Sequence, residues 1–443
     1  MALFKAYDIR GLYPSELNEE IARKIGFCFG KLIGGETYGI GRDMRLSGKS
    51  LMDALVDGLM RAGIKVIDLG MVATPMLTFS VVKYGLDAGI MVTASHNPKE
   101  YNGFKMVRKG GLPVGWDTGI EELQKMVSKL EAMPKPQPEA RVTEKSPLED
   151  YITHLLSFVR GAEGLTVAVD TAHGMAALYA ETLFEKLNCK LVPLYLDIDG
   201  NFPDHEPNPL KPENMRDLQK AVRETNADIG MEFDGDADRV AFVDEQGTII
   251  PCDLIIALLA KEALSESPGR TVVYDVRSSW AVREEIEALG GEAVMGRVGH
   301  SFMKGLLRET NGLLAGELSG HYYFSDNHFA DDGAIAAIKV INLLCKQKKP
   351  LSELVKPLKR YFASGEVNSD VADKEGKIAE LKEKFGSGNI TELDGLSVEF
   401  DDWWFNVRPS NTEPVLRLTV EAKTEDLMEQ KRDDLLCVIR SGS

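Results

Sequence analysis

Three aspartates at alternate positions are the side chains of this protein best suited to holding a metal ion. Asp234, Asp236 and Asp238 lie in the segment Asp234-Gly-Asp-Ala-Asp238. In an extended loop this spacing turns all three carboxylates to one side, where they can share a hard cation, and Mg²⁺ is the one we expect. A calcium EF-hand is rejected because Arg239 stands where its loop needs a glycine. On this segment alone, an acidic surface turn remains the alternative.

A serine with a histidine beside it stands in Thr93-Ala-Ser-His-Asn-Pro98. The Asn-Pro pair predicts a turn that ends the preceding strand. Ser95 is a candidate nucleophile activated by His96, or a phosphoryl carrier, and a plain Asn-Pro turn is the alternative. A Ser-His-Asp hydrolase is disfavoured because G-x-S-x-G does not surround Ser95. Lys105 follows closely, and it can stabilise charge or, with a lowered pKa, move protons.

A second polar loop groups side chains that bind sugar hydroxyls. Gly316-Glu-Leu-Ser-Gly-His321 offers the carboxylate of Glu317, the hydroxyl of Ser319 and the imidazole of His321. A polar turn is the alternative for this loop. His300 can equally be a ligand-binding residue or a histidine of the core. Zinc is not expected, because the histidines show neither H-E-x-x-H nor H-x-H spacing.

A further loop combines the groups that make an oxyanion pocket. Arg408-Pro-Ser-Asn-Thr-Glu-Pro414 carries a guanidinium, two hydroxyls and an amide between two predicted strands, near residues 403–407 and 415–420. Such a set suits a phosphate dianion, and a tight proline-flanked turn is the alternative. The motif G-x-x-x-x-G-K-[ST] is absent from the sequence, so a nucleotide triphosphatase has no support.

The elements that must position these loops repeat along the chain. Three segments each contain a strand, a helix-like stretch with apolar residues at three- and four-residue spacing, a second strand and a third strand. The first strands end at Asp43, Asp170 and Asp275. The third strands, at residues 88–92, 227–231 and 311–315, lead into the loops of Ser95, Asp234 and Glu317. The pattern predicts mainly parallel sheets with ligands beyond the carboxyl ends of the strands.

The fold class expected is α/β with four domains. Three have a related α/β topology, a mixed and mainly parallel sheet between helices, and the fourth is a smaller α+β domain. A proline-rich linker at residues 134–138 precedes the second domain, and a last amphipathic helix begins near Glu425. The predicted domains are 1–145 with the Ser95 loop, 146–248 with the metal loop, 249–362 with the sugar loop and 363–443 with the phosphate loop.

Composition limits the partners. The net charge of −17 argues against a nucleic-acid or anionic-membrane surface. The longest stretch without Asp, Glu, Lys or Arg, residues 69–82, has 14 residues and is too short to span a bilayer. Charges come too early for a signal peptide, and the five scattered cysteines lack C-x-x-C. We expect a cytoplasmic globular protein with neither nucleic-acid nor membrane partners.

Taken together, the four loops resemble those of the α-D-phosphohexomutase family, in its phosphomannomutase/phosphoglucomutase branch. The resemblance runs from Tyr7-Asp-Ile-Arg-Gly11 and Gly41-Arg-Asp-Met-Arg-Leu-Ser47 to the last loop. It implies four domains around a central cleft, a phosphoserine at Ser95, and Mg²⁺ held by the three aspartates and the Ser95 phosphate. The catalytic residues implied are Ser95, His96, Lys105, Arg10 and Arg239. The substrate-binding residues implied are Tyr7, His300, Glu317, Ser319, His321, Arg408, Ser410, Asn411 and Thr412.

The implied reaction interconverts hexose 1-phosphate and hexose 6-phosphate, of mannose, glucose or both. It would proceed through a phosphoserine and a bound hexose 1,6-bisphosphate, which also serves as activator. The expected substrate is a small phosphosugar, and the expected assembly is a monomer or homodimer. Phosphoglucosamine mutase, a metal-dependent sugar-phosphate hydrolase and a non-catalytic phosphosugar-binding protein are the alternatives. Two positions depart from many relatives: Ala237 stands where glycine is common, with little effect expected, and Arg277 stands where some have lysine.

Overall fold

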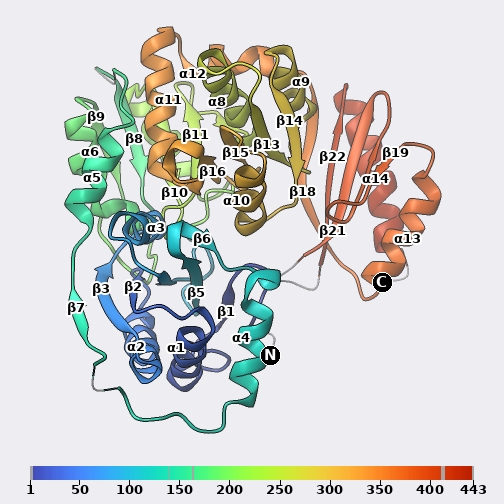
Figure 1. Cartoon of the computed structure of the whole chain (residues 1–443). Coiled ribbons are helices and arrows are strands. Elements are labelled where there is room, and N and C mark those ends of the chain that lie inside the picture. Colours follow the sequence, from blue (N-terminus) through green and yellow to red (C-terminus); the bar gives the residue numbers. More distant parts are fainter. Residues whose placement is uncertain (1–2, 138, 162–163, 411–414, 442–443) are drawn as a thin grey trace. The chain divides into compact units, whose positions relative to one another are not determined.

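The computed structural model describes residues 3–137, 139–161, 164–410 and 415–441. The chain forms two compact units, and each is described by itself (Figure 1). The first unit consists of Met1–Pro251 and Ser319–Glu353, and the second of Cys252–Leu318 and Leu354–Ser443. The last of the three boundaries along the chain falls within the short helix α12 (Leu351–Val355).

The first sheet of the first unit is mixed. Its strands, in the order β1-β5-β4-β2-β3-β7, are β1 (Ile9–Leu12), β5 (Tyr101–Arg108), β4 (Ala88–Val92), β2 (Thr37–Arg42), β3 (Lys65–Met71) and β7 (Val142–Glu144), and β6 (Leu112–Pro113) pairs with β5. The strands from β4 to β7 are parallel, whereas β5 runs antiparallel to β4 and β1. The flanking helices are α1 (Glu19–Ile33), α2 (Gly48–Ala62), α3 (Thr74–Lys83), α4 (Ile120–Lys129), η1 (Lys109–Gly111) and η2 (Trp116–Thr118).

The second sheet of this unit repeats the arrangement. Its strands, in the order β12-β11-β10-β8-β9, are β12 (Ile249–Ile250), β11 (Val240–Asp244), β10 (Ile229–Phe233), β8 (Thr166–Asp170) and β9 (Lys190–Leu194). The remaining elements are α5 (Leu148–Leu156), η3 (Met175–Leu178), α6 (Ala180–Lys186), α7 (Arg216–Thr225), the antiparallel pair β16 (Tyr322–Phe324) and β17 (Ala330–Asp331), η4 (Ser325–Asn327) and α11 (Gly333–Gln347). Strand β11 follows directly after the metal loop.

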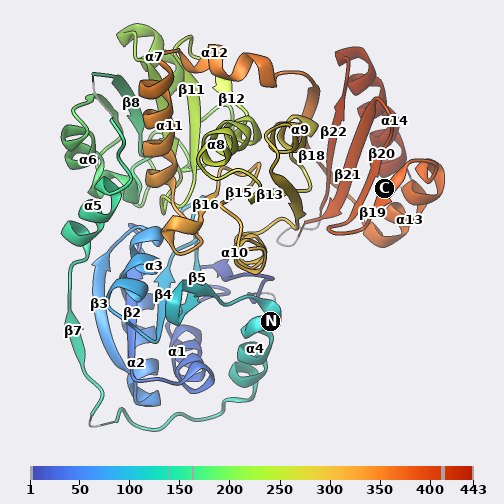
Figure 2. The same ribbon diagram turned by 45° about the horizontal axis from the view of Figure 1, so that its top comes forward.

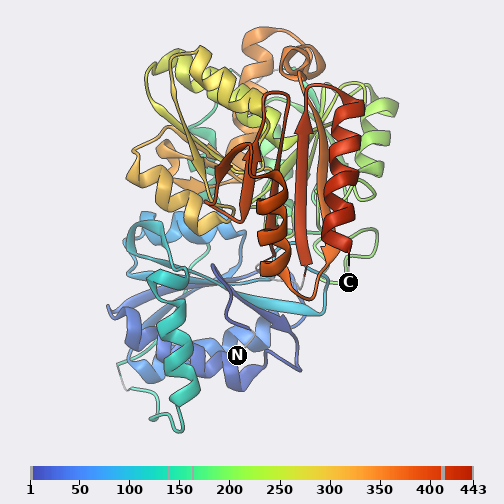
Figure 3. The same cartoon turned by 90° about the vertical axis from the view of Figure 1, so that its right-hand side faces the viewer.

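The second unit contains three parallel strands and a separate antiparallel sheet. The parallel strands are β13 (Thr271–Asp275), β14 (Glu292–Gly296) and β15 (Leu314–Gly316), with α8 (Cys252–Glu266), α9 (Trp280–Ala288) and α10 (His300–Glu309). The antiparallel order is β18 (Phe362–Asp370), β22 (Val415–Ala422), β21 (Trp403–Pro409), β20 (Leu396–Glu399) and β19 (Asn389–Thr391). Helices α13 (Lys374–Phe385) and α14 (Glu425–Arg440) share one apolar core with this sheet (Figure 3). The short η5 (Lys356–Leu358) precedes β18.

The predicted repeat is confirmed. In each copy the first strand lies between the second and the third, in the orders β3-β2-β4, β9-β8-β10 and β14-β13-β15. Figure 2 shows the first of these groups, with β2 between β3 and β4. The loops of Ser95 and Asp234 therefore leave the carboxyl ends of parallel strands, where the sequence predicts ligands. Within the described ranges, no helix is both long enough and apolar enough to cross a bilayer.

Candidate active site

Ser95 is held in a strained turn directly after β4. Its backbone has a φ of +51°, in the left-handed region that a residue with a Cβ adopts at a cost. Two hydrogen bonds fix the turn: the Ser95 N–H donates to Thr93 Oγ1 at 2.8 Å, and Thr93 Oγ1 donates to Asp43 Oδ2 at 2.6 Å. The serine is fully buried. A strained conformation fixed by its neighbours is typical of a functional position.

Arg45 clamps the same turn from its main-chain side. Its guanidinium donates to four carbonyl oxygens, those of Ser95 at 2.8 Å, Asn97 at 2.6 Å, Pro98 at 2.7 Å and Tyr101 at 3.0 Å. The arginine is itself buried, and its Nε lies 3.3 Å from Asp43 Oδ2. Arg45 thus satisfies backbone acceptors that the tight turn leaves without a strand partner.

The hydroxyl of Ser95 faces the metal loop. Ser95 Oγ donates to Asp234 Oδ2 at 2.7 Å and lies 3.1 Å from His96 Nδ1. Burial and the nearby cations, led by Arg239, lower the pKa of His96 well below its usual value. His96 is therefore neutral at pH 7 and suited to exchanging a proton with Ser95 Oγ.

The three aspartates converge as the sequence predicts. Asp234, Asp236 and Asp238 are buried, and one carboxylate oxygen from each lies within 4.8 Å of the others. Burial and the two neighbouring carboxylates raise the pKa of Asp234 well above its usual value. Among the described residues, Asp236 Oδ1 has no hydrogen-bond partner, and Asp238 Oδ1 has His321 Nε2 3.4 Å away. Buried, clustered and incompletely paired carboxylate oxygens fit a hard divalent cation.

Lys105 supplies positive charge to the cluster. Its Nζ lies 2.7 Å from Asp236 Oδ2 and also bonds Asp238 Oδ2, and Thr74 Oγ1 donates to Asp236 Oδ2 at 2.5 Å. Burial alone would lower the pKa of Lys105, but the three aspartates raise it above its usual value. In this arrangement Lys105 is a fixed cation that stabilises charge.

Ala237, in the metal loop, has a left-handed backbone conformation. Its φ of +61° lies in the left-handed region, where glycine is favoured. The common glycine at this position is thus a matter of backbone conformation. The expectation that Ala237 has little effect omitted this strain.

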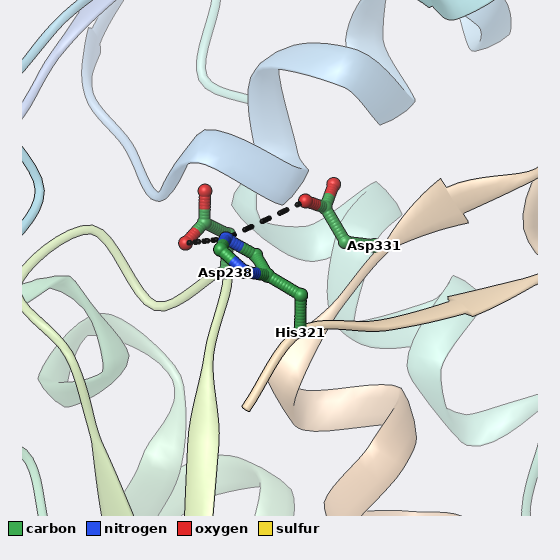
Figure 4. Close-up of side chains that lie close together, drawn as sticks. All are labelled: Asp238, His321 and Asp331. Carbon is green, nitrogen blue, oxygen red and sulfur yellow. Dashed lines mark ion pairs between the residues drawn. The ribbon is translucent and has the colours of Figure 1, made fainter. Parts of the chain in front are cut away.

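Arg239, Ser319 and His321 lie beside the aspartates in the first unit. Arg239 Nε lies 3.7 Å from Asp234 Oδ2 and 3.3 Å from His321 Nε2. His321 Nδ1 lies 3.0 Å from Ser319 Oγ, and Figure 4 shows the imidazole between Asp238 and Asp331, at 3.4 Å and 4.0 Å. The predicted sugar-loop residues Ser319 and His321 thus lie against the metal loop.

Arg10 is linked to the Ser95 turn. It donates to Asn97 Oδ1 at 2.6 Å and pairs with Asp8 at 2.5 Å. Burial alone would lower the pKa of Arg10, but Asp8 raises it above its usual value. Arg10 therefore remains a cation beside the turn and is unsuited to accepting a proton. Tyr7, two residues before the start of β1, is half-buried.

In the second unit, an aspartate ties the sugar loop to the end of β13. Asp275 accepts from the Leu318 N–H at 2.9 Å and pairs with Arg277 Nη2 at 2.6 Å. Glu317 Oε2 accepts from the Gly299 N–H at 2.8 Å, directly before His300, the first residue of α10. Glu317 and His300 are thus brought to the same loop cluster.

The predicted phosphate loop is described in part. Arg408, at the end of β21, donates to Glu366 Oε2 at 2.8 Å, and the Ser410 N–H donates to the Val415 carbonyl at 2.9 Å. Asn411 and Thr412 lie outside the described residues.

Several residues that support the site are assigned no role in it from the sequence, namely Asp43, Arg45, Thr74, Thr93, Asp275 and Glu366. A signal for two of them is in the repeat itself. Asp43 and Asp275 end equivalent strands, and each accepts from the N–H two residues on, at 2.9 Å and 2.8 Å. An aspartate that ends a strand and begins such a turn is free to reach a neighbouring loop with its other oxygen.

Comparison with known proteins places this geometry in a family. The phosphoglucomutase/phosphomannomutase models match at residues 1–133, 149–247 and 251–361 for alpha/beta/alpha domains I, II and III, and at 366–436 for the C-terminal domain. The chain belongs to the phosphoglucomutase/phosphomannomutase family. Members of this family are mutases, so the chain is an enzyme of that type. Each matched segment lies inside one of the four domains expected from the sequence.

Individual relatives align with this chain over all or nearly all of its length. A phosphomannomutase of Salmonella montevideo is 38% identical over 453 aligned residues, covering 100% of this chain and 99% of the relative. A phosphomannomutase/phosphoglucomutase of Pseudomonas aeruginosa is 38% identical over 437 residues, covering 97% and 93%. The crystal structure of a phosphoglucomutase/phosphomannomutase family protein from Burkholderia thailandensis superposes with a TM-score of 0.91 at 36% identity, covering 100% and 98%.

Proposed function

We propose that this enzyme interconverts the 1-phosphate and 6-phosphate of mannose, glucose or both, and that Ser95 carries the phosphoryl group between them. The observation that carries the proposal is the strained Ser95 turn, whose hydroxyl lies 2.7 Å from the first aspartate of a three-carboxylate cluster. A nucleophile, a cation-binding cluster and a cation at Lys105 in one buried place are what phosphoryl transfer requires.

The transfer step balances at Ser95. The bond between Ser95 Oγ and phosphorus breaks, a bond from phosphorus to the free sugar hydroxyl forms, and the hydroxyl proton ends on Ser95 Oγ. His96, neutral and 3.1 Å from that oxygen, is placed to pass the proton on. Lys105 and Arg239 offset the negative charge around the transferred group. The product is a bound hexose 1,6-bisphosphate, and the reverse step from its other end returns the phosphoryl group to Ser95.

Mg²⁺ is the cation we propose for Asp234, Asp236 and Asp238. When bound, it would neutralise charge on the transferring phosphoryl group. The donor set is all oxygen, as Mg²⁺ prefers, and a phosphate on Ser95 would add a further oxygen. Ser319, His321, Glu317 and His300 are the proposed contacts to the sugar. The phosphate that is not transferred is proposed to contact Arg408, Ser410, Asn411 and Thr412. Tyr7 is a further proposed contact to the substrate.

One assay separates the mutase from a hydrolase. The protein is incubated with mannose 1-phosphate, Mg²⁺ and a trace of hexose 1,6-bisphosphate, with glucose and glucosamine phosphates run in parallel. We expect mannose or glucose 6-phosphate to form with little inorganic phosphate. Steady release of inorganic phosphate would instead indicate a hydrolase, and turnover confined to glucosamine phosphate would indicate the phosphoglucosamine enzyme.

Removing the hydroxyl of Ser95 tests the proposed phosphoryl carrier. Ser95→Ala is expected to lower kcat by at least about 10³-fold, because the nucleophile has no substitute. Cys437→Ser, at an exposed thiol on α14, should leave kcat unchanged. Full activity of Ser95→Ala would eliminate the phosphoserine mechanism.

A further inference from the structure

The backbone of the metal loop (residues 234–238) is held by two other segments of the first unit. The Met175 N–H donates to the Gly235 carbonyl at 2.9 Å, and the Thr74 N–H donates to the Asp236 carbonyl at 2.9 Å. Both carbonyls lie in the stretch that joins the three aspartates. The direction of each carboxylate depends on the main chain of this stretch, so whatever fixes that main chain also fixes the proposed Mg²⁺ ligands.

Two glycines lie where neighbouring elements approach the loop most closely. Gly174 directly precedes η3, and Gly333 is the first residue of α11. A Cβ atom at Gly174 would lie 2.8 Å from the Gly235 carbonyl oxygen. A Cβ atom at Gly333 would lie 2.9 Å from the Arg239 carbonyl oxygen and 3.0 Å from that of Ala237. Nonbonded heavy atoms are in favourable contact at about 3.5–4.0 Å, so a side chain at either glycine would collide with the main chain in or directly after the metal loop.

The helix that begins at Gly333 is anchored at its start. Asp332 caps α11 with Oδ1, which accepts from the Ile335 N–H at 3.0 Å. Its Oδ2 accepts from the Tyr151 hydroxyl of α5 at 2.8 Å. Asp332 and Tyr151 are both buried. A side chain added at Gly333 would therefore displace the metal loop more readily than the helix.

The turn that carries Gly174 is anchored in a similar way. The Gly174 N–H donates to the Thr171 carbonyl at 2.7 Å, and the Ala172 N–H donates to Asp170 Oδ1 at 2.8 Å. His205 Nε2 lies 3.2 Å from Asp170 Oδ2. Burial alone would lower the pKa of His205, but Asp170 raises it to about 9, so an ion pair holds the start of this turn at pH 7.

We infer that Gly174 and Gly333 are positioning residues of the proposed Mg²⁺ site. The inference deepens the proposed function and rests on it. Because the glycines lack side chains, two anchored segments reach the loop and hold it in the conformation in which its three carboxylates converge. Ala237, with its left-handed backbone, lies at the Gly333 contact. A costly conformation of this kind persists only where the surroundings hold it, and Gly333 is part of those surroundings.

The test measures cation binding without turnover. Mn²⁺ shares the preference of Mg²⁺ for oxygen ligands, so it is titrated into the full-length protein, and free Mn²⁺ is followed by electron paramagnetic resonance with Mg²⁺ as competitor. Gly333→Ala and Gly174→Ala should each weaken Mn²⁺ binding about 10- to 100-fold, as loss of the groups that orient metal ligands generally does. Tyr151→Phe removes only the hydrogen bond to Asp332 and should weaken binding less, by up to about 10-fold. Urea unfolding of each variant is measured without metal.

Gly305→Ala is the matched control. Gly305 lies on α10, and a Cβ atom there meets nothing within 4 Å, so Mn²⁺ should bind as it does to the parent. Parental Mn²⁺ affinity in both Gly333→Ala and Gly174→Ala would overturn the inference even if their urea midpoints fall, because the glycines would then support the fold only. If neither glycine variant folds, parental affinity in Tyr151→Phe overturns it. Failure of the proposed function is distinguishable, because the parental protein itself would then hold no Mn²⁺ that Mg²⁺ displaces.

Discussion

In the first unit three aspartates surround one lysine, whereas in the second unit three arginines surround one glutamate. The arginines that pair with Glu366 are Arg277, Arg408 and Arg417. Each cluster contains an internal ion with the sign of the ligand proposed for it: Lys105 where Mg²⁺ is proposed, and Glu366 where phosphate is proposed. Without such an ion, like charges packed together would repel strongly. The opposite signs indicate that one device, an internal counter-ion, would preorganise the proposed cation site in one unit and the proposed anion site in the other.

The two regions also differ in what supports them, and replacing Arg45 is expected to have the largest effect. The Ser95 turn depends on one buried arginine, whereas most of the cluster around Glu366 lies on neighbouring strands of one sheet. Arg45→Met leaves the buried Asp43 without its cation and removes the guanidinium donors from four carbonyls, so we expect a loss of about 3–5 kcal/mol of stability. Urea unfolding followed by circular dichroism measures it.

The surface arginine Arg61 provides the comparison for Arg45. It lies on α2 and pairs with Asp57, both partly exposed. Arg61→Met should cost less than about 1 kcal/mol, as is usual for surface ion pairs. Equal effects of the two substitutions would show that Arg45 is not the support of the turn.

Protonating Glu366 should break the second cluster. Its folded pKa of about 2 lies below the ordinary value of 4.5, so its stabilisation is fully present above pH 4.5 and is lost as the pH falls towards 2. Glu366→Gln should therefore be less stable than the parent by about 2–3 kcal/mol at pH 6, with a smaller difference at pH 3. Urea midpoints at both pH values measure the difference. A stability difference that is the same at both pH values would contradict the role of the charge. The control Glu380→Gln, at a surface ion pair with Lys377, should have the stability of the parent at both pH values.

Thr74 sharpens the account of the first cluster. Its hydroxyl donates to Asp236 and thereby orients a proposed metal ligand. Thr74→Val should weaken Mg²⁺ binding about 10- to 100-fold, as loss of an outer-shell hydrogen bond generally does. The Mg²⁺ dependence of turnover and calorimetric titration measure this. Thr225→Val, at an exposed threonine of α7, should bind Mg²⁺ as the parent does.

The smallest effect is expected at Ala237. Glycine there would relieve the left-handed backbone, at some cost in chain entropy, so Ala237→Gly should stabilise the protein by about 0.5–1 kcal/mol. Ala221→Gly, inside helix α7, should instead destabilise it by about 1 kcal/mol. Thermal unfolding distinguishes the two signs, and destabilisation by both would contradict the strain at Ala237.

The succession of strands and helices along the chain could be predicted because each strand–helix–strand unit carries its own hydrophobic period. Every first strand predicted from its terminal aspartate, ending at Asp43, Asp170 or Asp275, lies at the centre of its three-strand group. The convergence of Asp234, Asp236 and Asp238 also followed from local spacing alone. Local patterns determine local structure, so these predictions needed no tertiary information.

The supporting residues could not be predicted in the same way. Arg45 acts on carbonyls about fifty positions along the chain, and Glu366 meets Arg408 through strand pairing across the sheet. Such contacts depend on register and on distant segments, which spacing does not encode. The raised pKa of Lys105 was missed for the same reason, because it arises from carboxylates of a different domain repeat.

The central claim, that Ser95 carries the phosphoryl group, can be tested directly. The protein is loaded with hexose 1,6-bisphosphate labelled in its phosphates, and the labelled residue is located by peptide mass spectrometry. Unlabelled mannose 1-phosphate and Mg²⁺ are then added. We expect the label on Ser95 alone, followed by its transfer to the sugar, first in hexose 1,6-bisphosphate and, once that intermediate has returned its other phosphate to Ser95, in hexose 6-phosphate. Label on another residue, or its appearance as inorganic phosphate, would contradict the account.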